Sequence, residues 1–265
     1  MANQLDDSVA VVTGSGAHSD RALGIGEATC RRFADEGADV IVVDVSEEMV
    51  KRTVAAIEPM AEGRVTGHAV DLTVEDEIER WADEIAATFG RVDVLVNNAG
   101  IRIAAGPVTG LDAEALDEIY AVNLRAMALC GKHLVAHMPA GGSIVNISSA
   151  NAKLGRGGWA AYDATKAGVL ALTRDMACDH ASDGIRVNSL LPGPTITDYH
   201  LRDGADPDER IESATTPRED GPGILKRSAH PSEIAAGVLF LASEDASFVT
   251  GAAIPVDGGL TAAGY

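Results

Sequence analysis

The sequence has few aromatic residues and no long apolar run. Phe, Trp and Tyr make up 4% of its 265 residues. No apolar stretch approaches the roughly 20 residues that a membrane-spanning helix needs. The N-terminal residues contain neither the basic region nor the apolar region that would direct secretion. These absences predict a cytoplasmic protein without a membrane-spanning segment.

Cysteine is also scarce, and its placement argues against disulfides and metal clusters. The three cysteines, Cys30, Cys130 and Cys178, are odd in number and far apart, and each falls in an expected helix, so reduced thiols are predicted. His133 and His137 have the spacing of a helical zinc pair, but Leu134 stands where the H-E-x-x-H motif has its glutamate. No third ligand follows from the pattern, and no metal is predicted.

Basic residues are outnumbered by acidic ones. The chain has 21 Lys and Arg against 40 Asp and Glu, which gives a formal net charge of −19. Such a charge repels nucleic acid and anionic membranes, so a small-molecule substrate is expected instead. Hydrophobic residues make up 46% of the sequence, enough for a sizeable core, and the 28 glycines suit tight turns and closely packed helices.

Apolar, β-branched runs alternate with helical patterns along the chain. The expected strands are residues 8–13, 38–46, 64–70, 92–96, 143–148, 185–191 and 252–259. The expected helices are 26–37, 47–61, 74–89, 113–138, 159–181 and 231–242, and residues 194–228 read as a loop or short helical flap. This alternation predicts an α/β fold, a Rossmann-type doubly wound parallel sheet of about seven strands with helices on both faces. No linker or repeat interrupts residues 1–265, so one domain is expected.

The first expected strand leads into a glycine-rich turn and then a helix. Backbone N–H groups and the positive end of the helix dipole face a phosphate pair in such a turn. Asp44, which closes the next strand, lies 18 residues past Gly26. This spacing is close to the ~20 expected of the acid that hydrogen-bonds an adenosine ribose. Because Asp44 would repel a 2′-phosphate, NAD(H) is predicted in preference to NADP(H).

Polar or glycine residues stand where six of the expected strands end. Ligands of open α/β sheets bind outside the carboxyl ends of the strands. The residues at or just past these ends are Gly14, Asp44, Asp71, Asn97, Ser149 and Pro192. The pattern predicts a ligand site along this edge of the sheet.

A serine, a tyrosine and a lysine in residues 148–166 could form a proton-transfer device. Tyr162 and Lys166 are i and i+4 in an expected helix, one turn apart on one face. A phenol beside an ammonium is biased toward phenolate. Ser149, thirteen positions before the tyrosine, could hold a substrate oxygen against that phenol. Because Y-x-x-x-K alone is frequent in surface helices, the interpretation depends on the cofactor site elsewhere in the chain.

These motifs resemble those of the classical short-chain dehydrogenase/reductase family over essentially the whole chain. The matching segments are the glycine-rich turn with Thr13, Gly14, Gly24, Ile25 and Gly26, NNAG at 97–100, Asn123 in VNL, NISS at 146–149, YDATK at 162–166, LPGP at 191–194 and VTGAAIPVDGG at 249–259. Each motif is weak alone. Their order and spacing together make the resemblance specific.

The resemblance implies a catalytic tetrad of Asn123, Ser149, Tyr162 and Lys166. Tyr162 would be the general acid/base and Ser149 would hydrogen-bond the substrate oxygen. Lys166 would lower the tyrosine pKa and bind the nicotinamide ribose, and Asn123 would hold a water that links Lys166 to solvent. Ser148 would point to the other side of its strand and be structural.

The resemblance also implies the cofactor contacts and the assembly. Besides Tyr162 and Lys166, the expected cofactor-binding residues are Gly14, Gly24, Ile25 and Gly26 at the pyrophosphate, Asp44 at the ribose, Asp71 and Leu72 at the adenine, Asn98, Ala99 and Gly100 in the centre, and Pro192, Gly193, Thr195 and Thr197 at the nicotinamide end. The family is usually tetrameric, through the long helices after the fourth and fifth strands and through the C-terminal segment.

The glycine-rich turn departs from the family pattern. Nine residues separate Gly14 from Gly24 where the family usually has three. This insertion leaves open which N–H groups meet the phosphates, and it brings His18 and Arg21 near the adenosine end. Arg21 could offset Asp44 and admit NADP(H), although a solvated loop arginine is the simpler interpretation.

Three functions remain at this point. The leading one is an NAD-dependent oxidoreductase that interconverts a secondary alcohol and a ketone. The alternatives are an NADPH-dependent 3-oxoacyl thioester reductase, which Asp44 disfavours, and a non-catalytic NAD(H)-binding protein, which the intact tetrad disfavours. Specificity is expected from residues 194–228 and 151–159, where Leu154 and Trp159 supply apolar surface and Arg156 an anchor. Trp159 could equally pack against the flap.

Overall fold

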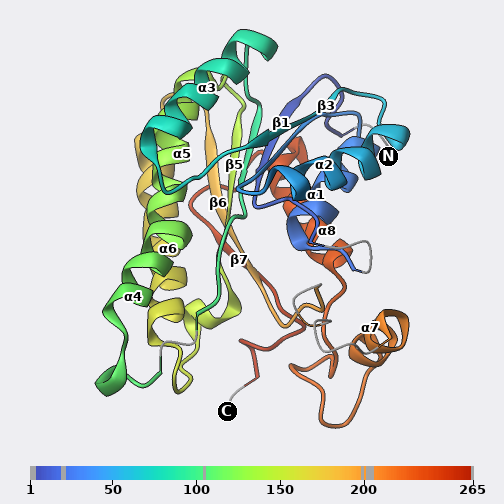
Figure 1. The fold of residues 1–265 in the computed structure, drawn as a ribbon, viewed down its shortest axis with the longest axis vertical. Coiled ribbons are helices and arrows are strands. Elements are labelled where there is room, and N and C mark those ends of the chain that lie inside the picture. Colours follow the sequence, from blue (N-terminus) through green and yellow to red (C-terminus); the bar gives the residue numbers. More distant parts are fainter. Residues whose placement is uncertain (1–3, 19–21, 104–105, 198–199, 201–205, 264–265) are drawn as a thin grey trace.

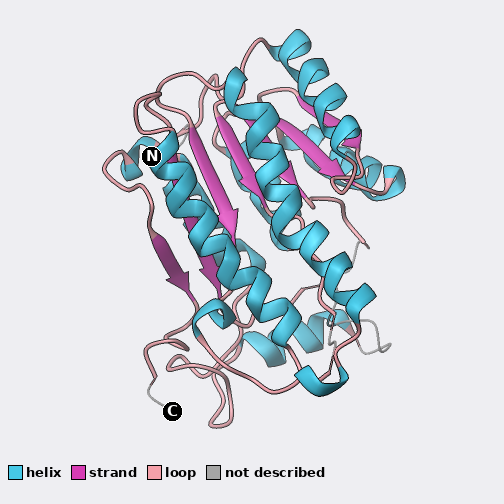
Figure 2. Cartoon of the chain, turned by 90° about the vertical axis from the view of Figure 1, so that its left-hand side faces the viewer, coloured by secondary structure: helices cyan, strands magenta, loops and turns pink. Residues whose placement is uncertain are grey.

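A single seven-stranded parallel sheet with helices on both faces forms the protein (Figures 1 and 2). The computed structural model describes residues 4–18, 22–103, 106–197, 200 and 206–263. The strand order is β3-β2-β1-β4-β5-β6-β7, which confirms the predicted Rossmann-type sheet. The strands are β1 (Val9–Thr13), β2 (Asp39–Asp44), β3 (Val65–Ala69), β4 (Val94–Asn97), β5 (Ser143–Ile147), β6 (Arg186–Pro192) and β7 (Ala253–Val256).

The helices form two layers that enclose the sheet. They are α1 (Ile25–Asp35), α2 (Glu47–Ile57), α3 (Glu75–Phe89), α4 (Ala113–Tyr120), α5 (Ala126–Leu134), α6 (Ala160–Asp179), α7 (Pro207–Thr215) and α8 (Pro231–Ala242). Figure 1 shows α1, α2 and α8 on one face and α3, α5 and α6 on the other. Within the described ranges, no helix is long and apolar enough to cross a membrane.

Alternate strand residues supply the two halves of the core. Val12 packs in the cluster that contains Phe33 of α1 and Ile234 of α8. Its neighbour Val11 packs in the cluster that contains Ile78 of α3 and residues of α5 and α6. Because both faces are covered, the inner strands carry apolar residues at successive positions and not only at every second one, as in VAVV of β1 and VIVV of β2. This is why they appear in the sequence as continuous β-branched runs.

The predicted helix 113–138 is not one regular α-helix. After α4 the chain forms a π-helical turn over Ala121–Arg125, continues as α5, and ends in a 3₁₀ turn at Val135–His137. His133 and His137 therefore lie on two different kinds of turn. Contacts with a distant segment explain the π turn, because Asn123 is hydrogen-bonded to the loop after β4, as described below. Such turns frequently occur at functional sites.

The other differences are smaller. The helix predicted for 47–61 ends at Ile57 and is followed by a 3₁₀ turn at Glu58–Met60 that contains Pro59, which has no N–H to continue the α-helix. The segment 194–228 contains the short helix α7 in its described part. Asp206 caps α7 by accepting hydrogen bonds from the N–H groups of Asp208 and Glu209.

Candidate active site

The carboxyl ends of the strands bring most of the predicted site residues to one edge of the sheet. Gly14 follows β1, Asp44 ends β2, Ser149 follows β5 and Pro192 ends β6. Asn97 ends β4 at the same edge, as predicted, but its side chain is buried between strands. Its Nδ2 donates to Oδ1 of Asn146 at 2.9 Å, and Asn146 Nδ2 donates to Thr173 Oγ1 of α6 at 3.0 Å. Asn97 thus ties β4 to β5 rather than facing a ligand.

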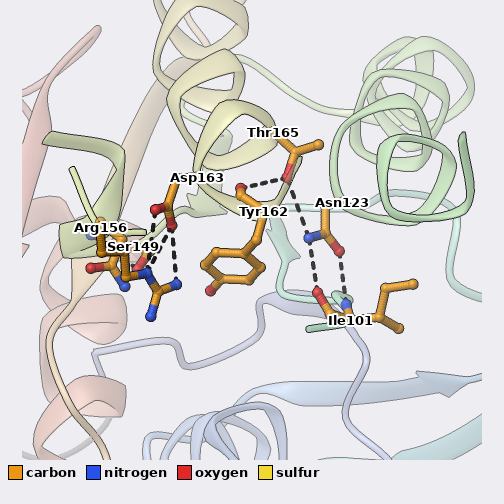
Figure 3. Close-up of polar contacts among 8 residues, drawn as sticks. Ile101, Asn123, Ser149, Arg156, Tyr162, Asp163 and Thr165 are labelled. Carbon is orange, nitrogen blue, oxygen red and sulfur yellow. Dashed lines mark hydrogen bonds and ion pairs between the residues drawn. The ribbon is translucent and has the colours of Figure 1, made fainter. Parts of the chain in front are cut away.

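Ser149 follows β5 and Tyr162 lies in the first turn of α6, in the same part of the molecule (Figure 3). Ser149 is close enough to the Tyr162 hydroxyl to lower its pKa. Ser149 is also the N-cap of the short 3₁₀ turn Ala150–Lys153, and its Oγ accepts from the Asn151 N–H at 3.2 Å. Ser148 Oγ donates to the Lys166 carbonyl at 2.7 Å. The two adjacent serines therefore have different environments, one beside the phenol and one against the backbone of α6.

Lys166 is buried beneath the tyrosine, one turn along α6. Its Nζ lies 5.9 Å from the centroid of the Tyr162 ring and donates to the Ile147 carbonyl at 2.9 Å. Burial lowers the pKa of Lys166 to about 8. A Cβ built at Gly100 would lie 3.4 Å from this Nζ and 3.3 Å from Asn123 Oδ1. Lys166, Asn123 and the NNAG loop thus converge on one point.

The π turn directs the Asn123 side chain at the backbone of Ile101. Its Oδ1 accepts from the Ile101 N–H at 2.7 Å, and its Nδ2 donates to the Ile101 carbonyl at 3.0 Å. Nδ2 also lies 3.4 Å from Thr165 Oγ1, which in turn donates to the Tyr162 carbonyl (Figure 3). Asn123 therefore connects the loop after β4 with the first turn of α6.

The protein environment raises the pKa of Tyr162. Burial is the largest influence and raises the pKa, and Asp163 raises it further. Ser149 and the guanidinium groups of Arg102 and Arg156 act in the opposite direction and lower it. Arg102 is a residue that the sequence analysis did not connect with the site. Its position two residues past NNAG, beyond the end of a central strand, is the signal that would have found it.

One aromatic ring and two arginines lie near Tyr162. The Trp159 and Tyr162 rings meet edge to face, with centroids 6.1 Å apart and planes at 82°. The Arg156 Cζ lies 4.2 Å from the Trp159 centroid and 5.5 Å from that of Tyr162. The Arg102 Cζ lies 5.3 Å from the Trp159 centroid. Arg156 also forms an ion pair with Asp163, with Nη2 3.0 Å from Oδ1.

The glycine-rich turn forms a tight cradle at the start of α1. Gly14 has a φ of +61°, and a Cβ there would lie 2.5 Å from Ala99 Cα. A Cβ at Gly26 would overlap the Gly14 carbonyl oxygen and lie 2.7 Å from Asn98 Nδ2, which itself donates to the Thr13 and Gly14 carbonyls. At Gly24, no atom of the described residues lies within 4 Å of such a Cβ. The turn is therefore tightly packed at Gly14 and Gly26, and the space beside Gly24 is open.

The open side of the cradle suits a phosphate group. Gly24 is the N-cap of α1 and provides no side-chain cap, so the first N–H groups of the helix are available to an anion. The backbone conformation of Gly24 is extended, with φ −83° and ψ 166°. The residues present therefore fit the pyrophosphate of a dinucleotide at this position.

The first part of the inserted loop is bound to β2 and α2. Ala17 N–H is hydrogen-bonded to Thr53 Oγ1 at 2.8 Å, and the same hydroxyl donates to the Ser15 carbonyl at 2.9 Å. The Gly16 N–H donates to Asp44 Oδ2 at 3.0 Å. The insertion thus holds the Asp44 carboxylate in place with one backbone N–H group. Arg21, considered above as a phosphate ligand, lies outside the described residues.

The remaining predicted cofactor residues lie along the same edge. Asp71 follows β3 and accepts from Thr73 N–H and Oγ1 through its Oδ1, and Leu72 beside it is buried. The Gly193 N–H donates to the Val256 carbonyl at 2.9 Å, and Thr195 Oγ1 donates to the Gly193 carbonyl at 3.0 Å. Thr197 is hydrogen-bonded to His200 Nδ1 through its N–H at 3.2 Å.

The cysteines and His133, one of the two histidines with the spacing of a zinc pair, have the following surroundings. Cys30 and Cys130 are buried, Cys178 is exposed, and all three are free thiols. His133 Nε2 lies 3.2 Å from Glu75 Oε1. Among the residues with described placement, no group of three His, Cys, Asp or Glu side chains could hold a metal ion.

Comparison with known proteins gives the family. Residues 16–261 match a family model described as enoyl-(acyl carrier protein) reductase. The cis-4-hydroxycyclohexanecarboxylate dehydrogenase of Sinomonas cyclohexanicum is 42% identical, with 99% of this chain and 100% of the relative covered. The meso-2,3-butanediol dehydrogenase of Serratia marcescens is 38% identical, with 98% and 96% covered. The chain belongs to the classical short-chain dehydrogenases/reductases.

A solved structure agrees with this assignment. A short-chain dehydrogenase/reductase from Burkholderia xenovorans superposes with a TM-score of 0.86 at 32% identity, with both chains covered completely. As a short-chain dehydrogenase/reductase, the protein is an oxidoreductase that uses a nicotinamide cofactor and interconverts a secondary alcohol and a ketone.

Proposed function

We propose that the protein is an NAD-dependent secondary-alcohol dehydrogenase in which Tyr162 is the general acid/base. The observation that carries the proposal is the grouping of Ser149, Tyr162 and buried Lys166 at the edge of the sheet that also holds the glycine cradle. A substrate oxygen placed between the two hydroxyl groups accepts one hydrogen bond and exchanges one proton.

The proposed mechanism assigns one task to each member of the tetrad. NAD, when bound, supplies the hydride acceptor, and NADH supplies the donor in the reverse direction. Tyr162 as phenolate takes the hydroxyl proton during oxidation, and Ser149 keeps the substrate oxygen in register. Lys166 carries the charge that favours phenolate, and in the reverse direction it replaces the proton that Tyr162 gives to the ketone oxygen. Because both amide atoms of Asn123 are engaged with Ile101, this side chain acts by positioning the loop after β4 against α6.

The cofactor is proposed to lie across the edge of the sheet. The pyrophosphate would meet the N–H groups at Gly14, Gly24, Ile25 and Gly26, the adenosine would lie by Asp44, Asp71 and Leu72, and the nicotinamide end would contact Asn98, Ala99, Gly100, Pro192, Gly193, Thr195 and Thr197. Asp44 supports NAD(H) over NADP(H), because a fixed carboxylate repels a 2′-phosphate.

The substrate proposed for the first assays is a small cyclic or vicinal alcohol. This choice follows the names of relatives that act on 4-hydroxycyclohexanecarboxylate, 2,3-butanediol and cyclopentanol. We propose that residues 194–228 form the loop that covers it. The alternative is reduction of a 3-oxoacyl thioester. A 3-oxoacyl-[acyl-carrier-protein] reductase of Thermotoga maritima is 36% identical to this chain. A preference for NADPH and a 3-oxoacyl substrate would favour that alternative.

A cytoplasmic homotetramer is the proposed form of the protein. The free thiols support a reducing compartment. The family resemblance supports tetramer contacts through α5, α6 and the C-terminal segment. Light scattering on the purified protein would measure the mass of the assembly.

The test of the proposed function is oxidation of cyclohexanol, 2,3-butanediol and 4-hydroxycyclohexanecarboxylate with NAD and with NADP. The Tyr162→Phe variant should lose activity by at least about 100-fold while its affinity for NADH changes by no more than a few fold. Retention of more than about a tenth of the rate in this variant would refute the general acid/base role. Binding of NADH without turnover of any alcohol or ketone would favour a non-catalytic NAD(H)-binding protein.

A further inference from the structure

The π turn sends side chains to two different loops at the carboxyl edge of the sheet. Asn123 reaches the loop after β4, where it is hydrogen-bonded to the backbone of Ile101. Arg125, the last residue of the π turn, reaches the loop after β3: its Nη1 donates to the Thr73 carbonyl at 2.8 Å. The proposed mechanism uses the first of these connections and has no step that uses the second.

The loop after β3 connects the strand to α3 and is folded by short-range hydrogen bonds. The Asp71 N–H donates to Glu77 Oε2 at 2.9 Å, and the Val74 N–H donates to the Asp71 carbonyl at 3.0 Å. Thr73 donates through its own N–H to Asp71 Oδ1 at 2.9 Å. These bonds set the shape of the loop and join it to α3. The Arg125 guanidinium ties the same loop to a different element, the π turn before α5.

The Thr73 carbonyl lies just outside the hydrogen-bond ladder of α3. Val74 is the N-cap of this helix, and its carbonyl is the first to accept a helical bond, from the Ile78 N–H at 3.3 Å. The preceding carbonyl therefore needs a partner from outside the helix. Arg125 supplies a charged donor, which makes a stronger hydrogen bond than a neutral one. It thereby fixes the chain immediately after Asp71 and Leu72.

Glu75, in the first turn of α3, holds the guanidinium from the other side. Its Oε2 lies 3.9 Å from Arg125 Nη2, and its Oε1 is bonded to Lys132 Nζ and lies 3.2 Å from His133 Nε2. Lys132 and His133 lower the pKa of Glu75, so the carboxylate stays ionised. The helices α3 and α5 pack side by side on this face of the sheet (Figure 1). The start of each is thus joined across the loop after β3.

The effect of this contact is expected to be local. The Arg125 side chain is 42% exposed and that of Glu75 is 34% exposed. Ion pairs with this exposure contribute little to global stability. Leu72, two residues from the carbonyl that Arg125 binds, is by contrast 8% exposed. Loss of the guanidinium should therefore change the position of the loop more than the stability of the fold.

We propose that Arg125 is a positioning residue for the adenosine half of the cofactor. This inference rests on the proposed function, which places the adenosine by Asp44, Asp71 and Leu72. Arg125 acts through the Thr73 carbonyl, which keeps Asp71 and Leu72 in place beside the end of β2. Because Arg125 stands two residues after Asn123, one π turn positions a loop at each end of the bound cofactor.

The test measures binding of ADP-ribose, which contains the adenosine half of the cofactor and cannot accept a hydride. Affinity is measured by calorimetry, and exchange of the backbone amide hydrogens of residues 71–74 is followed by mass spectrometry. Arg125→Met is compared with Lys132→Met. Both substitutions remove one positive charge beside Glu75, but only the first removes the hydrogen bond to Thr73.

Arg125→Met should weaken ADP-ribose binding by about 10-fold, as expected for the loss of one hydrogen bond to a charged group. Amide exchange at residues 71–74 should become faster. In alcohol oxidation, the loss should appear in KM for NAD rather than in kcat, because the nicotinamide end keeps its contacts once the cofactor is bound. Lys132→Met should change ADP-ribose affinity and loop exchange by less than about twofold, as an exposed ion pair does.

The outcomes separate this inference from the proposed function. Unchanged ADP-ribose affinity in Arg125→Met, or an equal loss in Lys132→Met, would overturn the role of Arg125 while alcohol oxidation stands. A loss confined to kcat would overturn it as well. Binding of ADP-ribose that depends on Arg125, in a protein that oxidises no alcohol, would support the role of Arg125 and overturn the proposed function.

Discussion

The Lys166 ammonium donates to the carbonyl oxygen of Ile147, 2.9 Å away at the end of β5. A charge buried beside a neutral carbonyl is poorly compensated, which is why burial lowers the pKa of Lys166 from 10.5 to about 8. The same group is required in the proposed mechanism. The active site therefore lowers the stability of the fold in which it is embedded.

The first prediction concerns the stability of Lys166→Met. Between about pH 8 and 10.5 the unfolded chain binds more protons at this position than the folded chain, so the cost of the buried charge is present below pH 8 and decreases as pH rises. At pH 7.5, Lys166→Met should be more stable than the wild type by about 2 kcal/mol, after a loss of about 1 kcal/mol for the hydrogen bond to Ile147. Urea unfolding measures this difference.

The pH dependence provides the control. The stability advantage of Lys166→Met should shrink between pH 7.5 and 9.5. The buried thiols of Cys30 and Cys130, whose pKa values burial raises to about 12, also change stability in this range but contribute equally to both proteins. Lys153→Met, at an exposed position, should show no such pH-dependent difference. A Lys166→Met protein less stable than the wild type at both pH values would contradict the assigned cost.

The second prediction compares two glycines of the cradle. Gly26→Ala should destabilise the protein by about 1–3 kcal/mol or more, because its Cβ overlaps the Gly14 carbonyl oxygen. Gly24→Ala should change stability by less than about 1 kcal/mol, since its backbone is extended and the space before it is open. Yet Gly24→Ala should weaken NADH binding by at least about 10-fold, because the added methyl group would prevent the pyrophosphate from approaching the backbone closely.

Thermal unfolding with and without NADH tests both substitutions at once. Stabilisation by the cofactor should be nearly lost in Gly24→Ala at a concentration that stabilises the wild type. Full stabilisation of Gly24→Ala by NADH would mean that the pyrophosphate does not approach this position.

The third prediction concerns the choice between NAD and NADP. Asp44→Asn keeps an oxygen that can accept from the Gly16 N–H but removes the negative charge. The NAD-over-NADP preference should therefore fall by about 10- to 100-fold, chiefly through tighter NADP binding. Glu48→Gln, an exposed change on nearby α2, serves as the charge control. A wild type that already prefers NADP would instead indicate that the inserted loop outweighs Asp44.

The fourth prediction uses the two opposite charges near Tyr162. Arg102 lowers the pKa of the phenol and Asp163 raises it. With a neutral alcohol as substrate, the rise of kcat/KM with pH should shift to higher pH in Arg102→Gln and to lower pH in Asp163→Asn. The measurement is a pH–rate profile of oxidation. Shifts in the same direction for both variants would show that the rate-controlling group is not Tyr162.

The architecture was predictable because the physics that builds it is local and repetitive. The inner strands are buried on both faces, so they appear as continuous apolar runs, and each run ends at the residue that the structure places at the carboxyl edge, as at Asp44. The spacing of Ser149 and Tyr162 follows from one strand leading into one helix.

The parts that the sequence did not predict depend on contacts between distant segments. The apolar pattern runs without a break through residues 121–125, and the π turn there is explained only by the bonds of Asn123 to Ile101. Arg102 belongs to a loop without periodicity. Its place just past NNAG indicates the edge of the sheet but does not predict its approach to Trp159. Asn97 ends β4, as predicted, but the sequence does not show that its amide is used inside the sheet.

The paired amides of Asn97 and Asn146 also determine the alignment of β4 with β5. The two residues are direct partners across the strands, with Val96 opposite Val145 beside them. A slip of one residue would separate the two amides and leave them buried without this hydrogen bond, which costs free energy. A pair of valines at these positions would impose no such cost. Ser149 follows Asn146 by three residues, and Gly100 follows Asn97 by three. The Asn97–Asn146 pair inside the sheet therefore sets the alignment of the loop after β4, which contains Gly100, with the loop after β5, which contains Ser149.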